Sequence, residues 1–360
     1  MTTCVQKPKI FGTGLIALDW VMGSNPRSPV WSSAGGTCGN ILSILAFLGW
    51  DAFPIARLSG DVASERVKAD MARWDVRLDF VSCGLASQTP IIIQEIRRGS
   101  DGSPTHRFSW SCPRCGNWLP SFRAVTRDAA ETVAPSLKNS AVFFMDRLSR
   151  AALSLAARAS AEGAIVVFEP SARSDDKLFA EAIGIAHIVK YADQRLAAVG
   201  GAMVGDSAAL LEVQTLGAEG LRYRHRLSRT PSDWMYLPAV PAPRLADTCG
   251  AGDWCTAGIL AKAAMGGQVG FRSGGVAAIG SALRYGQALA AWNCAFEGAR
   301  GGMYAVTRPV FEQQVQALAS GRGIALSEAA ETDHATEVNC PACPPQSVRS
   351  LGSTTSCCAP

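Results

Sequence analysis

The sequence has no run of about eighteen uncharged apolar residues, so we expect no membrane-spanning helix. Residues 1–12 also lack the long apolar segment and the cleavage site of a signal peptide, and residues 10–21 are predicted to form a first strand. The formal net charge of +4 is too small and too scattered for a nucleic-acid partner. These absences favour a cytoplasmic protein that binds neither membrane nor nucleic acid.

Cysteine, in contrast, is frequent, with 12 residues. Because the chain has 360 residues and is 48% hydrophobic, it can bury a large core without disulfide support. The cysteines are spread along the chain, which favours a reducing compartment over an oxidised secreted scaffold. The length suits one large α/β domain or two small ones.

Short apolar strands alternate with helices from about residue 140 onward. The expected strands are 141–145, 165–168, a short one ending at Lys190, and 210–215. This order is typical of a parallel sheet covered by helices on both faces. Ligands of such sheets bind at the carboxyl ends of the strands. The residues at or just past expected strand ends are Asp19, Glu169, Lys190 and Gly217.

The stretch D-T-C-G-A-G-D-W-C at residues 247–255 places flexible backbone ahead of an acid and a helix. Gly250 and Gly252 tolerate backbone conformations barred to other residues. The amides of residues 250–252 would then face outward at the positive end of the helix, which forms a phosphate site. Asp253 is either a group with chemical function or simply the N-cap of that helix.

A second glycine turn, G-G-T-C-G-N at residues 35–40, leads into an apolar helix predicted over residues 41–48. Asn40 lies near the start of that helix, and Asp19 near the end of the first strand. A carboxylate and an amide can together orient neighbouring hydroxyl groups of a ligand. The alternatives are a helix cap for Asn40 and a turn residue for Asp19.

These two stretches, in this order, resemble the signature regions of the ribokinase-like (PfkB-type) carbohydrate kinases, G-G-x-x-x-N early and D-T-x-G-A-G-D late. The resemblance extends over about residues 8–318. It implies an α/β fold, a ribokinase-like three-layer αβα sandwich with a mostly parallel central sheet and a small β lid. We expect a kinase domain over residues 1–324, with the lid from about 12–34 and 86–120, and a flexible tail over 325–360.

The resemblance also implies ATP-dependent phosphorylation of an alcohol group on a sugar or sugar-like molecule, nucleosides included. Asp253 would be the base, and the amides of Gly250, Ala251 and Gly252 the anion hole. The residues expected at the acceptor are Asp19, Gly35, Gly36 and Asn40. Those expected at the nucleotide are Lys190, Thr215, Gly217, Gly220 and Asn293; for Asn293 the alternative is an amide on the helix surface. A catalytically silent ligand-binding or regulatory protein of the same fold is the competing hypothesis.

The stretch at Lys190 departs from the family pattern K-x-N-x-x-E, since it reads K-Y-A-D-Q-R. The amide and the acid associated in the family with Mg²⁺ and phosphate are both missing. Mg²⁺ is still expected with ATP, because the metal neutralises the triphosphate. Asp193 and Glu169 are candidates to replace the missing groups.

Two C-x-x-C pairs raise the question of a metal. Cys112 and Cys115 interrupt the expected lid, and Cys340 and Cys343 lie in the tail. Together they offer four thiolates for a structural Zn²⁺. The alternatives are unrelated thiols, a site completed by another ligand such as His106, and a redox pair. The resemblance favours a homodimer formed through the lid. The insertion that carries Cys112 and Cys115 would block such a dimer.

Overall fold

The computed structural model describes residues 6–23, 30–84, 87–100, 102–173, 175–199, 202–203 and 205–326. Most of the expected tail, with Cys340 and Cys343, lies outside these residues. Among the helices that the structure describes, none combines the length and apolar character needed to cross a bilayer.

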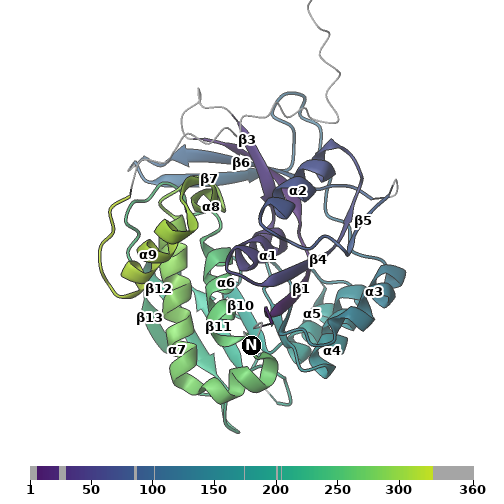
Figure 1. The fold of residues 1–360 in the computed structure, drawn as a ribbon, viewed down its shortest axis with the longest axis vertical. Helices are drawn as coiled ribbons and strands as arrows, with labels where there is room; N and C mark the ends of the chain where they lie inside the picture. Colours follow the sequence, from purple (N-terminus) through teal and green to yellow (C-terminus); the bar gives the residue numbers. More distant parts are fainter. Residues whose placement is uncertain are drawn as a thin grey trace, which may run out of the picture.

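A nine-stranded sheet forms the centre of the fold, with the strand order β13-β12-β11-β10-β9-β8-β1-β4-β5 (Figure 1). Its strands are β1 (Lys9–Thr13), β4 (Asp51–Leu58), β5 (Val81–Cys83), β8 (Val142–Met145), β9 (Ile165–Phe168), β10 (Ile188–Ala192), β11 (Leu211–Thr215), β12 (Gly220–His225) and β13 (Met235–Pro238). The pairs from β11 to β5 are parallel, and only β12 and β13 are antiparallel. The mostly parallel sheet is therefore confirmed.

Helices cover both faces of this sheet. They are α1 (Thr37–Phe47), α2 (Val62–Arg73), α3 (Arg127–Val133), α4 (Arg150–Ala161), α5 (Asp176–Ile185), α6 (Ala251–Ala263), α7 (Gly267–Asn293), α8 (Gly301–Ala305) and α9 (Arg308–Ala319). Neighbouring residues of β1 show the two faces, because Ile10 packs with α1 and α6 while Phe11 packs with α4 and α5. The three-layer sandwich is confirmed, and in Figure 1 α3, α4 and α5 lie together, apart from α1, α6 and α7.

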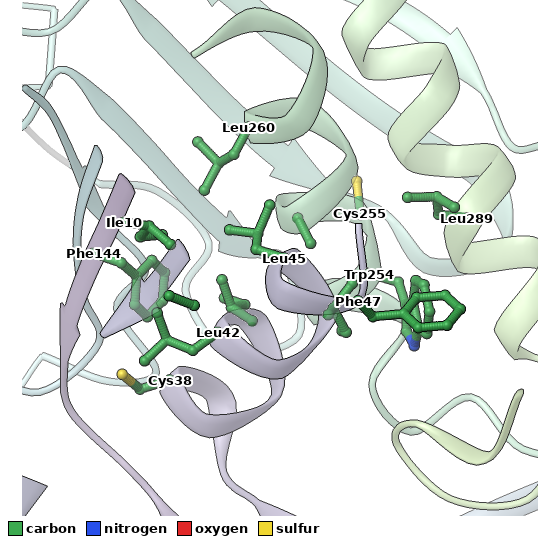
Figure 2. Packing of buried hydrophobic residues seen from close by; sticks show 14 of the residues in the cluster. Ile10, Cys38, Leu42, Leu45, Phe47, Phe144, Trp254, Cys255, Leu260 and Leu289 are labelled. Carbon is green, nitrogen blue, oxygen red and sulfur yellow. The ribbon is translucent and has the colours of Figure 1, made fainter. Parts of the chain in front are cut away.

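Aromatic packing fixes α6 against α1. Trp254 is fully buried, and its ring lies edge-on to Trp292, with 5.3 Å between centroids, and to Phe47, at 6.4 Å. Figure 2 shows Phe47 and Trp254 side by side, with Leu42 of α1 beside Phe144 of the sheet and Leu45 between Ile10 and Leu260. The residue before Trp254 is Asp253, so this packing also positions the acid.

A second sheet of four strands has the order β3-β2-β6-β7 and forms the small lid. Its strands are β2 (Ala17–Met22), β3 (Trp31–Gly35), β6 (Ile91–Arg98) and β7 (Pro104–Ser109). The pairs β2–β3 and β6–β7 are antiparallel and β2–β6 is parallel, so the lid is a mixed sheet. The hairpin predicted between the β6 and β7 regions is confirmed.

The prediction of one strand over residues 10–21 was wrong. The chain leaves the central sheet after β1 and enters the lid as β2. Between them, the amide of Leu15 donates to Asp146 Oδ1 at 2.9 Å, a contact 131 positions away in sequence. The strand is therefore interrupted by a long-range hydrogen bond that periodicity does not reveal.

Candidate active site

Asp253 lies in the first turn of α6, and it is not the N-cap. The N-cap is Gly250, whose φ of 74° is left-handed, and no side chain caps the helix. A Cβ on Gly250 would overlap the carbonyl of Ala299, so glycine is required there on two counts. The interpretation of Asp253 as a simple cap was wrong, and its carboxylate is available for another role.

The carboxylate of Asp253 is bound by an amide from the other motif. Asn40 Nδ2 donates to Asp253 Oδ2 at 2.7 Å, which joins two motifs 213 positions apart. Burial raises the pKa of Asp253 to about 7, and the negative charge of Glu169 adds to the rise, while Asn40 and Lys190 oppose it. Asp253 can therefore gain and lose a proton near neutral pH.

Asn40 is also not a helix cap. The N-cap of α1 is Gly36, and no side chain caps that helix. The Asn40 side chain is 4% exposed, and its Oδ1 accepts from Arg300 Nε at 3.1 Å. Both ends of the amide are thus engaged inside the site.

Asp19 lies within β2, opposite Ser33 of β3, so its predicted place at a strand end was wrong. Its carboxylate lies against the glycine turn, where a Cβ on Gly35 would overlap Asp19 Oδ2. Burial raises the pKa of Asp19 to about 7, against the charge of Arg300 and a hydrogen bond from the Gly36 amide. The structure therefore brings Asp19, the Gly35-Gly36 turn and Asn40 together.

Lys190 lies beside the glycine turn of α6. Its side chain is 2% exposed, and its Nζ donates to Glu169 Oε1 at 2.7 Å. The other oxygen of Glu169 accepts from Thr256 Oγ1 at 2.6 Å. A Cβ on Gly252 would lie 3.7 Å from Lys190 Nζ, so the ammonium group is next to the turn amides. This place suits a cation that helps to hold phosphate.

The expected nucleotide turn follows β11. Thr215 ends that strand, Gly217 begins the short turn that follows, and Gly220 is the first residue of β12. The amide of Asp193 donates to the carbonyl of Thr215 at 3.0 Å, so this turn adjoins the segment after Lys190. The two expected nucleotide segments therefore meet at the carboxyl ends of β10 and β11.

Asn293, at the end of α7, is fully buried, so its interpretation as a helix-surface amide was wrong. Its Nδ2 donates to the carbonyls of Ala299, at 3.1 Å, and Cys249, at 3.3 Å. Its Oδ1 accepts from the amide of Gly302. Asn293 thus ties the loop after α7 to the α6 turn, and a contact with the nucleotide stays a prediction.

Two further residues at the site were not predicted from the sequence. Asp146 and Arg147 follow β8, and Arg147 Nη1 donates to Asp146 Oδ2 at 2.8 Å and to Ser171 Oγ at 3.0 Å. Burial raises the pKa of Asp146 to about 6, against the charge of Arg147. Both residues directly follow the apolar run 141–145. Because ligands of parallel sheets bind at the carboxyl ends of strands, this position could have predicted them.

Arg147 lines a cavity of about 260 Å³ between the core and the lid. Most of the lining is apolar, and it includes Leu15, Pro90, Ile92, Trp110 and Phe122. Leu15 connects this cavity to the glycine stretch at residues 35–40, since its carbonyl accepts from the amide of Gly39 at 3.2 Å. The lid therefore lines a small, mostly apolar cavity beside the glycine turn.

The cysteine pair of the lid lies in a tight turn. The amide of Cys112 donates to the carbonyl of Asn117 at 2.8 Å, and the amide of Gly116 to that of Cys112 at 2.9 Å. Cys112 is buried and Cys115 is exposed. Over the described parts of the chain, no three His, Cys, Asp or Glu side chains are grouped to hold a metal ion, His106 included. The four-cysteine zinc site stays a prediction, because Cys340 and Cys343 lie outside those parts.

The sequence matches the pfkB family of carbohydrate kinases over residues 23–304. This match covers well over half of the chain, so the protein belongs to the PfkB carbohydrate kinase family. No protein in a comparison with curated sequences matches the chain.

Solved structures of the same fold are numerous. A fructokinase from Xylella fastidiosa with bound ATP is 20% identical with a TM-score of 0.65, covering 88% of this chain and 99% of its own. A ribokinase from Arabidopsis thaliana complexed with ribose and ATP is 16% identical with a TM-score of 0.61, over 87% and 99%. A nucleoside kinase from Burkholderia thailandensis with inosine is 20% identical with a TM-score of 0.62, over 87% and 98%. At these identities the likeness shows the fold alone.

Proposed function

We propose that the protein transfers the terminal phosphoryl group of ATP to an alcohol group of a sugar or sugar-like molecule, nucleosides included. The observation that carries this proposal is the position of Asp253. Its carboxylate is held by Asn40 in the first turn of α6, where Gly252 lies next to Lys190. The Ala251 amide donates to the Thr248 carbonyl at 3.2 Å, so the amides of Gly250 and Gly252 are the proposed anion hole. A base, an anion hole and a cation thus converge at one helix end.

The proposed reaction is a direct transfer. The acceptor hydroxyl gives its proton to the Asp253 carboxylate as its oxygen forms a bond to the terminal phosphorus. The bond from that phosphorus to the bridging oxygen breaks, and ADP leaves with the electron pair. The amides of Gly250 and Gly252 and the Lys190 ammonium group stabilise the negative charge that develops on the phosphoryl oxygens.

The acceptor would lie between the lid and α1. Asp19 Oδ1 is buried without a hydrogen-bond partner, so it can accept from an acceptor hydroxyl. The apolar cavity beside Leu15 and Arg147 would take the less polar part of the acceptor. The fructokinase, ribokinase and nucleoside kinase of the same fold support this range of acceptors. We propose Thr215, Gly217, Gly220 and Asn293 as the nucleotide side.

The residues of the site suit a Mg²⁺ ion bound to the ATP phosphates better than one held by protein side chains alone. Both oxygens of Glu169 accept from protein donors, Lys190 and Thr256, which leaves this carboxylate poorly suited to a metal. Asp193 is exposed, and its Oδ1 accepts from the amide of Gln194 at 2.8 Å. Mg²⁺ bound to ATP would supply positive charge on the phosphate oxygens.

The test is ATP consumption by the purified protein with a panel of sugars, sugar phosphates and nucleosides. We expect turnover with one acceptor class, and a loss of at least about 100-fold in kcat for Asp253→Asn, because amide nitrogen cannot take the proton. With Asp253 protonated below its pKa of about 7, the rate of the parent should fall as the pH decreases through that value.

Arg150→Lys is the control, because Arg150 is an exposed residue of α4 and the change keeps its positive charge. The kcat of this variant should equal that of the parent. An Asp253→Asn variant as fast as the parent would contradict the assignment of the base. ATP binding without turnover for any acceptor would favour the competing hypothesis, a catalytically silent binding protein. The ion pair between Lys190 and Glu169, in which the carboxylate offsets the charge of the ammonium group, supports that alternative.

A further inference from the structure

Arg300 is a buried arginine that lies outside both glycine motifs. It precedes α8, and its side chain is only 1% exposed. Its Nη2 donates to Asp70 Oδ2 at 2.7 Å and to the carbonyl of Ala34. Asp70 is held in turn by the hydroxyl of Tyr304 and by the amide of Ala34, both at 2.9 Å. One amino group of Arg300 is thus anchored to α2 and to the end of β3.

The Nε of Arg300 determines the orientation of the Asn40 amide. Nε donates to Asn40 Oδ1 at 3.1 Å, and Asn40 Nδ2 donates to Asp253 Oδ2 at 2.7 Å. Because a guanidinium group can only donate, the amide oxygen has to face Arg300. The amide nitrogen is then directed to Asp253. In the opposite orientation, the amide oxygen and the carboxylate would be two acceptors in contact.

Arg300 also lies near the second carboxylate of the site. Asp19 is 6% exposed, and the charge of Arg300 favours its ionised form. The Oδ1 of Asp19 and the Nη1 of Arg300 are both buried without hydrogen-bond partners. The free oxygen of Asp19 is the atom that an acceptor hydroxyl would pair with, and the charge of Arg300 favours the ionised form of this carboxylate.

We propose that Arg300 is a positioning residue of the phosphotransfer site, which fixes the Asn40 amide with its nitrogen toward Asp253. This proposal rests on the function proposed above. The donor from Asn40 holds Oδ2 and hence the plane of the carboxylate, and Oδ1 of Asp253 takes the proton of the acceptor. Arg300 acts through Asn40 and not on the transferred group.

The test is a double-mutant cycle with Arg300→Lys and Asn40→Ala. Lysine keeps a positive charge beside Asp70 and removes the planar Nε donor. We expect Arg300→Lys to lower kcat by about 10- to 100-fold, with the KM for ATP within about twofold of the parent. In the Asn40→Ala background the same change should alter kcat less than about twofold, because the amide that Arg300 orients is absent. Losses that simply multiply would overturn the proposal.

Two further variants strengthen the cycle. Arg308→Lys is the matched control, since Arg308 also donates to a main-chain carbonyl, that of Phe47, and pairs with Glu312 on α9. Its kcat should equal that of the parent, and an equal loss there would refute a specific role for Arg300. Arg300→Gln enters the same cycle with the same expected outcome, so that the test does not depend on the folding of one variant.

A readout without turnover separates this proposal from the proposed function. The side-chain amide of Asn40 in isotope-labelled protein, assigned by its loss in Asn40→Ala, should give one ordered pair of NMR resonances. We expect this pair to shift or broaden in Arg300→Lys. An unaffected pair would refute the positioning role whatever the activity, whereas an ordered pair in a parent without acceptor turnover would refute the function alone.

Discussion

The packing of Asp19 against Gly35, on the proposed acceptor side of the site, depends on the absence of a Cβ atom at residue 35. The carboxylate of Asp19 occupies the space that a Cβ would need. Asp19 is buried, so it cannot move aside as the end of a long exposed chain would. Gly39, the third glycine of the same stretch, is different, because the nearest atom to its Cβ would be Ile16 Cγ2 at an ordinary 3.6 Å.

These two glycines give a matched pair of variants. Gly35→Ala should destabilise the fold by about 1–3 kcal/mol through overpacking and should raise the KM for the acceptor. Gly39→Ala, inside α1, should be neutral or stabilise by up to about 1 kcal/mol, because alanine favours the helix. Urea denaturation and acceptor titration measure both effects. Equal tolerance of the two changes would contradict the placement of Asp19.

Among single residues, the sequence predicted those site residues that lie within a recognisable local motif. The Gly-Ala-Gly-Asp turn could be predicted because the backbone of a phosphate turn is local. Arg300 could not, since its partners Asn40 and Asp70 are 260 and 230 positions away. No feature of G-A-R-G distinguishes a buried, oriented arginine from an exposed one.

At the scale of elements, the lid is connected to the α6 turn through Asp247, the first residue of that motif. Gln94 of β6 donates to Asp247 Oδ2 at 2.6 Å, and His106 of β7 lies 3.4 Å from Oδ1. The amides of Cys249 and Gly298 donate to the same carboxylate at 3.0 and 2.9 Å. Two lid strands and the glycine turn before α6 therefore share one buried side chain.

Loss of this connection should loosen the lid. Gln94→Leu removes a buried donor and should destabilise the fold by about 1–3 kcal/mol, with faster hydrogen exchange in β6 and β7. The neighbouring residue Glu95 points to the opposite face and pairs with Arg97 on the surface. Glu95→Ala should therefore change stability by less than about 0.5 kcal/mol. Equal protection of the lid in both variants would contradict the connection through Asp247.

Element type was more predictable than element partnership. The helix over 150–161 and the strand over 165–168 match α4 and β9 because each has a clear period or a short apolar run. The antiparallel pair β12 and β13 was not predicted, since residues 220–238 carry many polar side chains. The break between β1 and β2 includes the hydrogen bond from the Leu15 amide to Asp146. The periodicity of residues 10–21 does not indicate this distant partner.

At the scale of the whole molecule, the described members of the two core clusters and the candidate active-site residues all lie between residues 6 and 326. We therefore expect a chain that ends at residue 326 to unfold at the same temperature as the full chain and to keep its kcat. Calorimetry and the ATP assay check this expectation. A large loss of stability on truncation would show that the segment beyond residue 326 belongs to the fold.

The same two proteins test the zinc prediction. Zinc bound at one ion per full chain and lost from the truncated chain would support the site of Cys112, Cys115, Cys340 and Cys343. The variant Cys115→Ser in the full chain should then lose the metal as well, because a structural site needs all four ligands. Zinc retained by the truncated chain would contradict the four-cysteine arrangement.

The division of the site between two sheets has a consequence for how such a protein can diversify. Asp19 belongs to the lid sheet, whereas Lys190 belongs to the central sheet and Asp253 to helix α6, which covers that sheet. In the proposed reaction, the lid carries recognition of the acceptor and the core carries the phosphate chemistry. Exchange of lid side chains such as Ile92 and Trp110 would therefore redirect the enzyme to a new acceptor with its chemical machinery untouched, and directed evolution has a small, defined target.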